Sequence, residues 1–125
     1  MKFTIPGKPV GKKNSMQIIL RGGHPALTQS DEYKAYEELA GLYIPNKWDC
    51  LQGPVNVKCV YYVPDLRRRD LANLQQATLD ILVKYGVLRD DCWTVVQSMD
   101  GSRVYLDKDK PRAEIEITEV AEEGA

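Results

Sequence analysis

The chain has 125 residues, of which 43% are hydrophobic and 28% are charged, a balance typical of one globular domain spanning 1–125. No apolar run approaches the roughly 18 residues that a membrane span requires, and the opening residues are interrupted too early for a secretory signal, so we expect a cytoplasmic protein. The net charge of −1 argues against a nucleic-acid-binding protein, unless basic residues gather on one face.

The first part of the chain predicts two short strands. Residues 2–6 form a candidate first strand, and the Pro and Gly residues that follow are turn signals. A second, apolar strand is expected over 16–20. The next residues, 21–25, indicate a hairpin turn or a flexible loop that carries His24, which we expect to be a surface histidine without a role.

A helix and a strongly patterned strand are expected next. Ser30 or Asp31 can cap a helix that runs to about Tyr43, with an apolar stripe of Tyr33, Tyr36, Leu39 and Leu42. We expect the two tyrosines of this stripe to pack in the core. Residues 55–63 alternate between two faces and end at a proline, so they predict a half to fully buried strand.

The segment after this strand predicts a second helix with clear ends. Asp70 stands at the N-cap position, and Gly86 stands where a C-terminal glycine belongs. Between them one face carries, at helical spacing, Leu71, Leu74, Thr78, Ile81, Leu82 and Tyr85. This face is expected to pack on the sheet.

The last part of the chain predicts two strands, at about 93–99 and at 113–118. Residues 102–106, after a turn or bulge at Asp100 and Gly101, are a further candidate strand that the order below does not count. The tail after about 120 is expected to fray. The whole order is β-β-α-β-α-β-β, an α+β fold with a mixed sheet and two main helices.

The cysteine and histidine content restricts the type of metal site. Cys50, Cys59 and Cys92 are an odd number without a CxxC pair, which indicates reduced structural thiols. His24 is the one histidine, so a histidine-rich metal centre is excluded. Any metal would be held by oxygen ligands, which favours Mg²⁺ or Mn²⁺. Nothing indicates a small-molecule cofactor.

Basic and acidic residues gather around the start and the end of the second helix. Arg67, Arg68 and Arg69 precede the helix start, where backbone N–H groups favour anions. Asp70, Asn73 and Asp80 share a helix face, and Asp90 and Asp91 follow the helix. Converging carboxylates need a counter-charge such as a hard divalent cation, and such a centre can assist phosphodiester hydrolysis. Alternatively, Asp70 is a simple cap, the Asp pair a solvated turn and the arginines a solvated patch.

The same residues resemble the signature of the RusA-like family. That signature is an Arg-rich D-x-D-N-L at a helix start, then "LD", then "G-V/F…D-D"; its counterparts are Pro64 to Leu74, Leu79 with Asp80, and Gly86 to Asp91. Pro6 and Pro9 with Asn14 resemble the family's N-terminal P-x-P…N pattern, and Glu114 to Glu119 resemble its closing strand. The resemblance spans essentially the whole chain.

The resemblance implies a magnesium-dependent nuclease, with Mn²⁺ as a further possible metal, that binds four-way DNA junctions as a homodimer and makes paired, symmetric nicks. The metal-site and catalytic residues that it implies are Asp70 and Asp91, with Asp90 as the neighbouring acid. It implies DNA contacts for Arg67, Arg68 and Arg69, and we expect one for Asn14, which matches the family's N-terminal pattern. On charge alone we add Lys12, Lys13 and Arg103. A phage or a prophage-bearing bacterium is the expected source.

Two positions depart from the family pattern. Ala72 stands where the second carboxylate of D-x-D is expected, and Gln76 stands where a lysine is expected. A methyl group cannot bind a metal, and alanine does not weaken a helix, so the fold is expected to survive while cleavage suffers. Ala72 is either engineered or a natural loss of activity, or else Asp80 or Asp90 replaces the missing ligand; the sequence leaves these three readings open.

Three hypotheses follow. The first is a Holliday junction resolvase, possessing the family's nuclease activity unless Ala72 disables it. The second is a junction-binding protein without nuclease activity, and the third an unrelated α+β interaction domain with an acidic partner. Trp93, Tyr61 and Tyr62 are candidates for stacking on unpaired bases, although aromatic residues in alternating strands usually belong to the core.

Overall fold

The structure is a computed structural model that describes residues 1–12 and 16–120. Lys13, Asn14 and the tail after about 120 lie outside the described residues. In chain order the elements are β1 (Lys2–Pro6), β2 (Met16–Arg21), β3 (His24–Gln29), α1 (Asp31–Tyr43), β4 (Val55–Val63), α2 (Leu71–Lys84), β5 (Val96–Ser98), β6 (Arg103–Leu106) and β7 (Arg112–Glu119).

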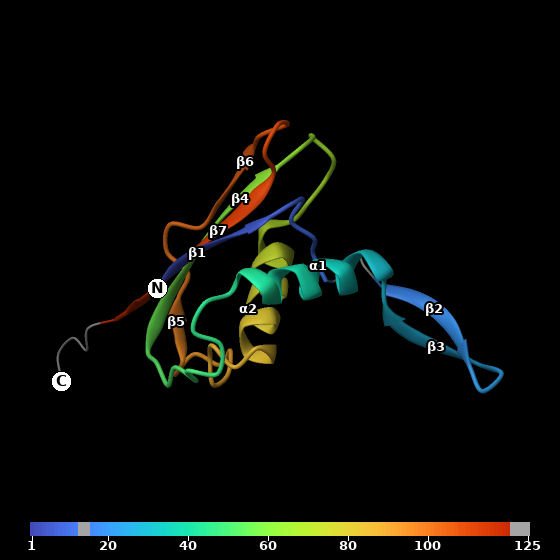
Figure 1. Ribbon diagram of the computed structural model, residues 1–125, viewed down its shortest axis with the longest axis horizontal. Helices are drawn as coiled ribbons and strands as arrows, with labels where there is room; N and C mark the ends of the chain where they lie inside the picture. Colours follow the sequence, from blue (N-terminus) through green and yellow to red (C-terminus); the bar gives the residue numbers. More distant parts are fainter. Residues whose placement is uncertain (13–15, 121–125) are drawn as a thin grey trace.

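The main sheet is mixed, as the sequence predicted for an α+β fold. Its order is β1-β7-β4-β5, and β6 also pairs with β4. β7 lies antiparallel between β1 and β4, whereas β5 and β6 run parallel to β4. The two helices lie together beside the sheet (Figure 1). The burial of β4 alternates strictly along its nine residues, as its sequence pattern predicted, because one face packs in the core.

A separate two-stranded hairpin corrects the prediction for 21–25. β3 begins at His24, so that residue lies in a strand rather than in a loop, and the turn is confined to Gly22 and Gly23, whose φ values are +59° and +82°. Pro25 deterred a strand prediction, but a proline is tolerated in a strand that has an open edge. The hairpin extends away from the main sheet, beyond α1 (Figure 1).

Helix α1 begins where the sequence indicated. The Ser30 hydroxyl accepts a hydrogen bond from the Tyr33 N–H at 3.2 Å, which is an N-cap contact. Tyr33 and Tyr36 are buried, as predicted for packing residues. The prediction is wrong for Leu42, which is 79% exposed, because a position nine residues after Tyr33, at about 100° per residue, lies on the opposite side of the helix.

Helix α2 is hydrogen-bonded to β4 through the buried hydroxyl of Tyr61. Asp70 is the N-cap residue but makes no side-chain cap hydrogen bond, and Gly86 ends the helix with a φ of +67°. The Tyr61 hydroxyl of β4 donates to the Leu74 carbonyl at 2.9 Å and lies 2.6 Å from the Thr78 hydroxyl. Tyr61 is therefore a core residue, and it sets which face of α2 points outward.

The strand predicted at 93–99 is shorter than expected. β5 covers Val96–Ser98, and a turn before it carries Trp93, which is 78% exposed. The three cysteines are free thiols, but Cys59 alone is buried, so the prediction of structural thiols fails for the other two. Burial raises the pKa of the Cys59 thiol to about 11. Among the described residues no helix is long and apolar enough to cross a membrane.

The Tyr61 contact predicts a stability change. Tyr61→Phe is expected to lower the free energy of unfolding by about 1–2 kcal/mol, because the Tyr61 hydrogen bonds to Leu74 and Thr78 are lost, and only the Thr78 hydroxyl is left to donate to the Leu74 carbonyl. Urea unfolding measures the change. Tyr43→Phe, at a half-exposed tyrosine of α1, is the control and is expected to change stability by less than about 0.5 kcal/mol. Equal effects of the two substitutions would contradict the assignment.

Candidate nucleic-acid interface

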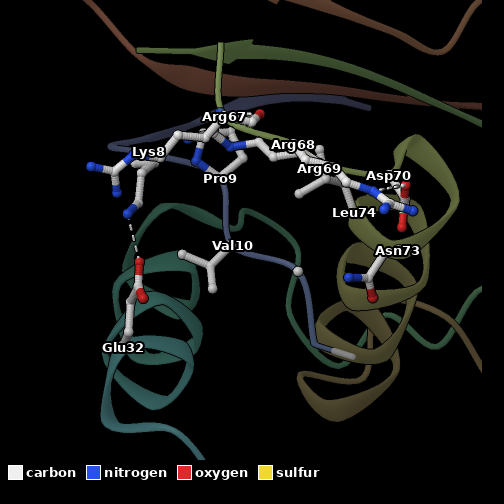
Figure 2. A pocket seen from close by; sticks show the side chains of 11 residues that line it. Lys8, Pro9, Val10, Glu32, Arg67, Arg68, Arg69, Asp70, Asn73 and Leu74 are labelled. Atoms are coloured by element: carbon white, nitrogen blue, oxygen red, sulfur yellow. Dashed lines mark hydrogen bonds and ion pairs between the residues drawn. The ribbon is translucent and has the colours of Figure 1, made fainter. Parts of the chain in front are cut away.

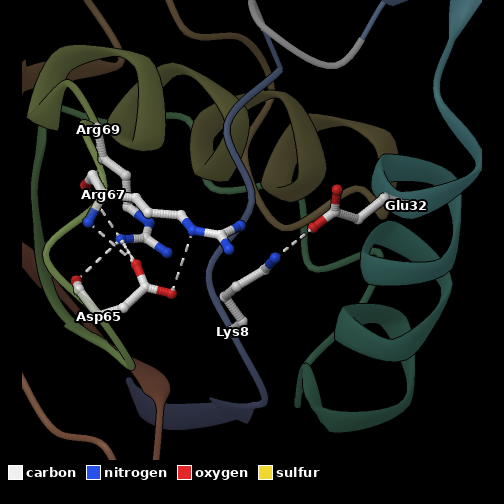
Figure 3. A network of polar contacts seen from close by, with 5 residues as sticks. All are labelled: Lys8, Glu32, Asp65, Arg67 and Arg69. Carbon is white, nitrogen blue, oxygen red and sulfur yellow. Dashed lines mark hydrogen bonds and ion pairs between the residues drawn. The ribbon is translucent and has the colours of Figure 1, made fainter.

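The segment after β1 passes between the two helices and joins them (Figures 2 and 3). Lys8 forms an ion pair of 2.7 Å with Glu32 of α1. Further on, a Cβ atom at Gly11 would lie 2.6 Å from the Asn73 amide nitrogen, so a larger residue there would have to displace the Asn73 side chain of α2. The Lys12 ammonium then donates to the Asp80 carboxylate at 3.0 Å.

The segment after β1 and the start of α2 border a basic cavity of about 380 Å³ (Figure 2). Four cationic side chains and two carboxylates are among its lining residues, which are Lys8, Pro9, Val10, Gly11, Glu32, Arg67, Arg68, Arg69, Asp70, Asn73 and Leu74. The N-terminus of α2 adds the positive end of the helix dipole. An anionic group such as a phosphate is the ligand that this lining favours.

The three arginines of the cavity, Arg67, Arg68 and Arg69, differ in exposure and in ion pairing. The Arg69 guanidinium is 16% exposed and donates to the Asp65 carboxylate at 2.8 Å and to the Arg67 carbonyl at 3.2 Å, so it shapes the loop (Figure 3). This hydrogen bond, helped by the Arg67 N–H, holds the pKa of Asp65 below its ordinary range. Arg67 and Arg68 are 85% and 91% exposed, with acidic neighbours no nearer than 4.0 and 3.9 Å respectively. These two can turn toward a ligand.

A second polar group lies further along the outward face of α2. Ala72, Gln76 and Asp80 follow one another at intervals of four residues and therefore form one stripe. The Gln76 amide nitrogen donates to Asp80 at 3.0 Å and to Asp91 at 3.3 Å. Asp91 thus folds back onto the helix, and a chain of contacts runs from Lys12 through Asp80 and Gln76 to Asp91.

The carboxylates that the sequence suggested as one site lie against α2 at different positions. Asp70, half-exposed, precedes the first turn of α2, whereas Asp91 meets the helix at Gln76, about 9 Å further along the axis. Asp90 accepts the Asp91 N–H at 2.8 Å, and this hydrogen bond lowers its pKa. Within residues 1–12 and 16–120, no three His, Cys, Asp or Glu side chains are grouped so as to hold a metal.

The remaining predicted DNA-contact residues lie apart from the cavity lining. Lys12 contacts the Asp80 carboxylate. Arg103 is exposed on β6, in register with Val60 of β4. Sequence reasoning missed the contributions of Lys8 and Glu32, because their contact depends on where the segment after β1 crosses α1. The Pro and Gly turn signals around Lys8 were the one local hint.

The Arg69 contact predicts a titration result. Arg69→Gln is expected to raise the pKa of Asp65 toward its ordinary range, since the Arg69 hydrogen bond is the largest cause of the low value. In the unmodified protein the contact is complete above the ordinary Asp pKa and weakens as pH falls through the lowered pKa. Carbon-detected NMR of the carboxyl groups measures both. Arg67→Gln, which keeps the backbone N–H, should give a smaller rise; an unchanged Asp65 pKa in Arg69→Gln would contradict the account.

Comparison with known proteins identifies the family. The family model described as Endodeoxyribonuclease RusA matches residues 6–118. The chain is 41% identical over 97 residues to the crossover junction endodeoxyribonuclease RusA of Escherichia coli (strain K12), covering 75% of this chain and 78% of that protein. It is also 41% identical over 71 residues to the crossover junction endodeoxyribonuclease of Enterobacteria phage 82, covering 56% of each. The chain therefore belongs to the RusA family.

Proposed function

We propose that this protein recognises four-way DNA junctions as a homodimer, with the apparatus of a crossover junction endodeoxyribonuclease, and that Ala72 disables strand cleavage. The names of its E. coli and phage relatives support the substrate class. They also support a place of action inside a bacterial or phage-infected cell. Family membership excludes the reading as an unrelated interaction domain.

The observation that carries the proposal is the basic cavity at the start of α2. Two of its cations, Arg67 and Arg68, are largely exposed, while Arg69 and Lys8 are held by ion pairs. A phosphate placed there meets fixed positive charge and the end of a helix dipole, and the exposed arginines can close on it. The net charge of −1 does not oppose this, because the cations gather at one place.

Two copies suit a junction because its two exchanging strands are equivalent by symmetry. In a homodimer with a two-fold axis, each subunit presents the same cavity to one of these strands. Paired recognition also raises the apparent affinity, since the second contact becomes intramolecular once the first is made. A dimer is therefore part of the proposal.

The residues present do not complete the divalent metal site that the family implies. Mg²⁺ and Mn²⁺ prefer carboxylate oxygens, and the described residues gather no group of three possible ligands. Position 72, between Asp70 and the Gln76 level, carries a methyl group on the outward face of α2. The Gln76 amide nitrogen donates hydrogen bonds to both the Asp80 and the Asp91 carboxylates. We therefore propose that this chain binds junctions and cleaves them poorly or not at all.

A second candidate, an active Mg²⁺-dependent resolvase that makes paired symmetric nicks, is favoured by one observation. Asp80 and Asp91 share a single donor, the Gln76 amide nitrogen, so two carboxylates already lie side by side on α2. Asp80 would then stand in for the ligand missing at position 72. Magnesium ligands lie about 2.0–2.1 Å from the ion, so Gln76 would have to turn aside.

The basic cavity predicts a salt-dependence experiment. For the unmodified protein, affinity for a four-way junction is expected to fall steeply with salt, because phosphate contacts release counterions. Arg67→Ala and Arg68→Ala should each weaken binding and reduce the slope of log affinity against log salt by about 1. Lys34→Ala, an exposed lysine of α1 outside the cavity lining, is the control and should leave the slope unchanged. A flat salt dependence, or equal slopes in all four proteins, would remove the assignment.

Position 72 predicts a gain of activity. Ala72→Asp is expected to nick a four-way junction symmetrically in Mg²⁺ and not in EDTA, and adding Gln76→Lys should raise the rate further, because an ammonium, unlike an amide, can act as a cation toward a phosphate or leaving oxygen. Denaturing gels of end-labelled junctions measure the nicks. Ala35→Asp, the same exchange at another exposed helix position, is the control and should remain inactive.

The nicking assay also separates the two candidates. Nicking by the unmodified protein that disappears in Asp80→Asn would favour the active resolvase. Binding by every variant, with nicking only after Ala72→Asp, would support the disabled form. If no variant binds four-way DNA better than duplex, both candidates are wrong.

A further inference from the structure

The turn after Asp91 presents a large aromatic ring to solvent. Trp93 is 78% exposed and stands two residues beyond Asp91, whose carboxylate contacts α2 through Gln76. Two residues span at most about 7 Å, so Trp93 lies near the Asp80 and Asp91 carboxylates, which meet at Gln76 on the outward face of α2. Burying the indole would gain roughly 1.5–3 kcal/mol, so the exposed ring is available to a partner.

The backbone on both sides of Trp93 is fixed. The Cys92 carbonyl accepts hydrogen bonds from the Val95 and Val96 N–H groups, both at 2.9 Å. Val95 is fully buried, and its carbonyl accepts from the Val55 N–H of β4 at 2.8 Å. The ring is thus carried on a turn that is anchored to the sheet, and a ligand that stacks on it meets a surface that is already ordered.

The surroundings of Trp93 favour a flat, neutral ligand over a protein surface. Protein-docking surfaces are contiguous apolar patches, whereas the residues from 89 to 94 other than Trp93 are Arg, Asp, Asp, Cys and Thr, all of them exposed. The two aspartates disfavour a phosphate at the ring itself, so the base rather than the backbone is the part of a nucleotide that would contact Trp93. A nucleobase offers a neutral π-face, and stacking on an aromatic side chain does not depend on its sequence.

The other aromatic candidates are already engaged. Tyr61 is buried and bonded to α2. The Tyr62 ring is stacked on Tyr105 at 5.7 Å between centroids and covered by the Arg112 guanidinium at 3.7 Å. Trp48 is 70% exposed, but its ring packs against Gly86 at the far end of α2, where a Cβ atom would lie 2.3 Å from the indole.

We propose that the indole of Trp93 stacks on an unpaired or unstacked base at the crossover of the four-way junction, beside the strand that approaches Asp91. This inference rests on the proposed function, because it takes branched DNA as the ligand. It assigns to Trp93 the discrimination of branched from fully paired DNA. A base in continuous duplex has both faces covered, so it cannot receive the ring without unstacking.

Two single-tryptophan variants test the contact directly. Trp48→Phe leaves Trp93 as the one tryptophan, and Trp93→Phe leaves Trp48. Titration with a synthetic four-way junction in EDTA is expected to quench the emission of Trp93, and linear duplex with the same arms to quench it less. The emission of Trp48 should be nearly constant. Saturating junction binding without a change in Trp93 emission would overturn the proposal.

Affinity gives the second measurement. Trp93→Ala is expected to weaken junction binding about five- to a hundredfold and duplex binding by less than twofold, as the loss of one base stack implies. Trp48→Ala is the matched control, and circular dichroism checks that each variant is folded. If Trp93→Ala instead alters self-association in sedimentation and leaves junction affinity unchanged, Trp93 is a protein contact and the proposal is wrong. An unmodified protein that does not prefer the junction to duplex refutes the proposed function itself, and the inference with it.

Discussion

The buried Tyr61 hydroxyl is the contact on which the candidate site depends. It joins the middle of β4 to the first turns of α2 through the Leu74 carbonyl and the Thr78 hydroxyl. A helix packed on a sheet by apolar residues alone tolerates some rotation, whereas directional hydrogen bonds permit little. With this rotation set, the stripe of Ala72, Gln76 and Asp80 points away from the core and becomes available to ligands.

Two segments from distant parts of the sequence then complete the outward face of α2. The segment after β1 crosses from α1 to α2 and brings Lys8 to the cavity and Lys12 to Asp80. The turn after α2 folds back and brings Asp91 to Gln76, with Trp93 beside it. Positive charge therefore gathers at the start of α2, and carboxylates gather further along the helix. This arrangement suits a phosphate bound at the basic cavity and strand cleavage at the carboxylates. In this chain Ala72 lies between the cavity and the carboxylates.

The sequence predicted what local chemistry determines. Periodicity indicated both helices, alternation indicated β4, and capping chemistry placed Ser30 and Gly86 at helix ends. The strand β3 escaped because Pro25 contradicts strand propensity, and only pairing with β2 compensates. The sequence indicated which residues belong to the candidate site but not how they are arranged in space. Helical spacing implies that Asp70 and Asn73 face outward together, yet no local rule tells how far Asp91 folds back or that Lys12 meets Asp80.

Manganese binding by the unmodified protein, without DNA, tests most directly the claim that Ala72 leaves the carboxylate site incomplete. Electron paramagnetic resonance of free Mn²⁺ reports the bound fraction. We expect no saturable stoichiometric site in the unmodified protein, because the described residues gather no three possible ligands and the Gln76 amide already occupies oxygens of Asp80 and Asp91. Stoichiometric binding by the unmodified protein that is lost in Asp80→Asn would contradict the account, since it would show that Asp80 already supplies the missing ligand.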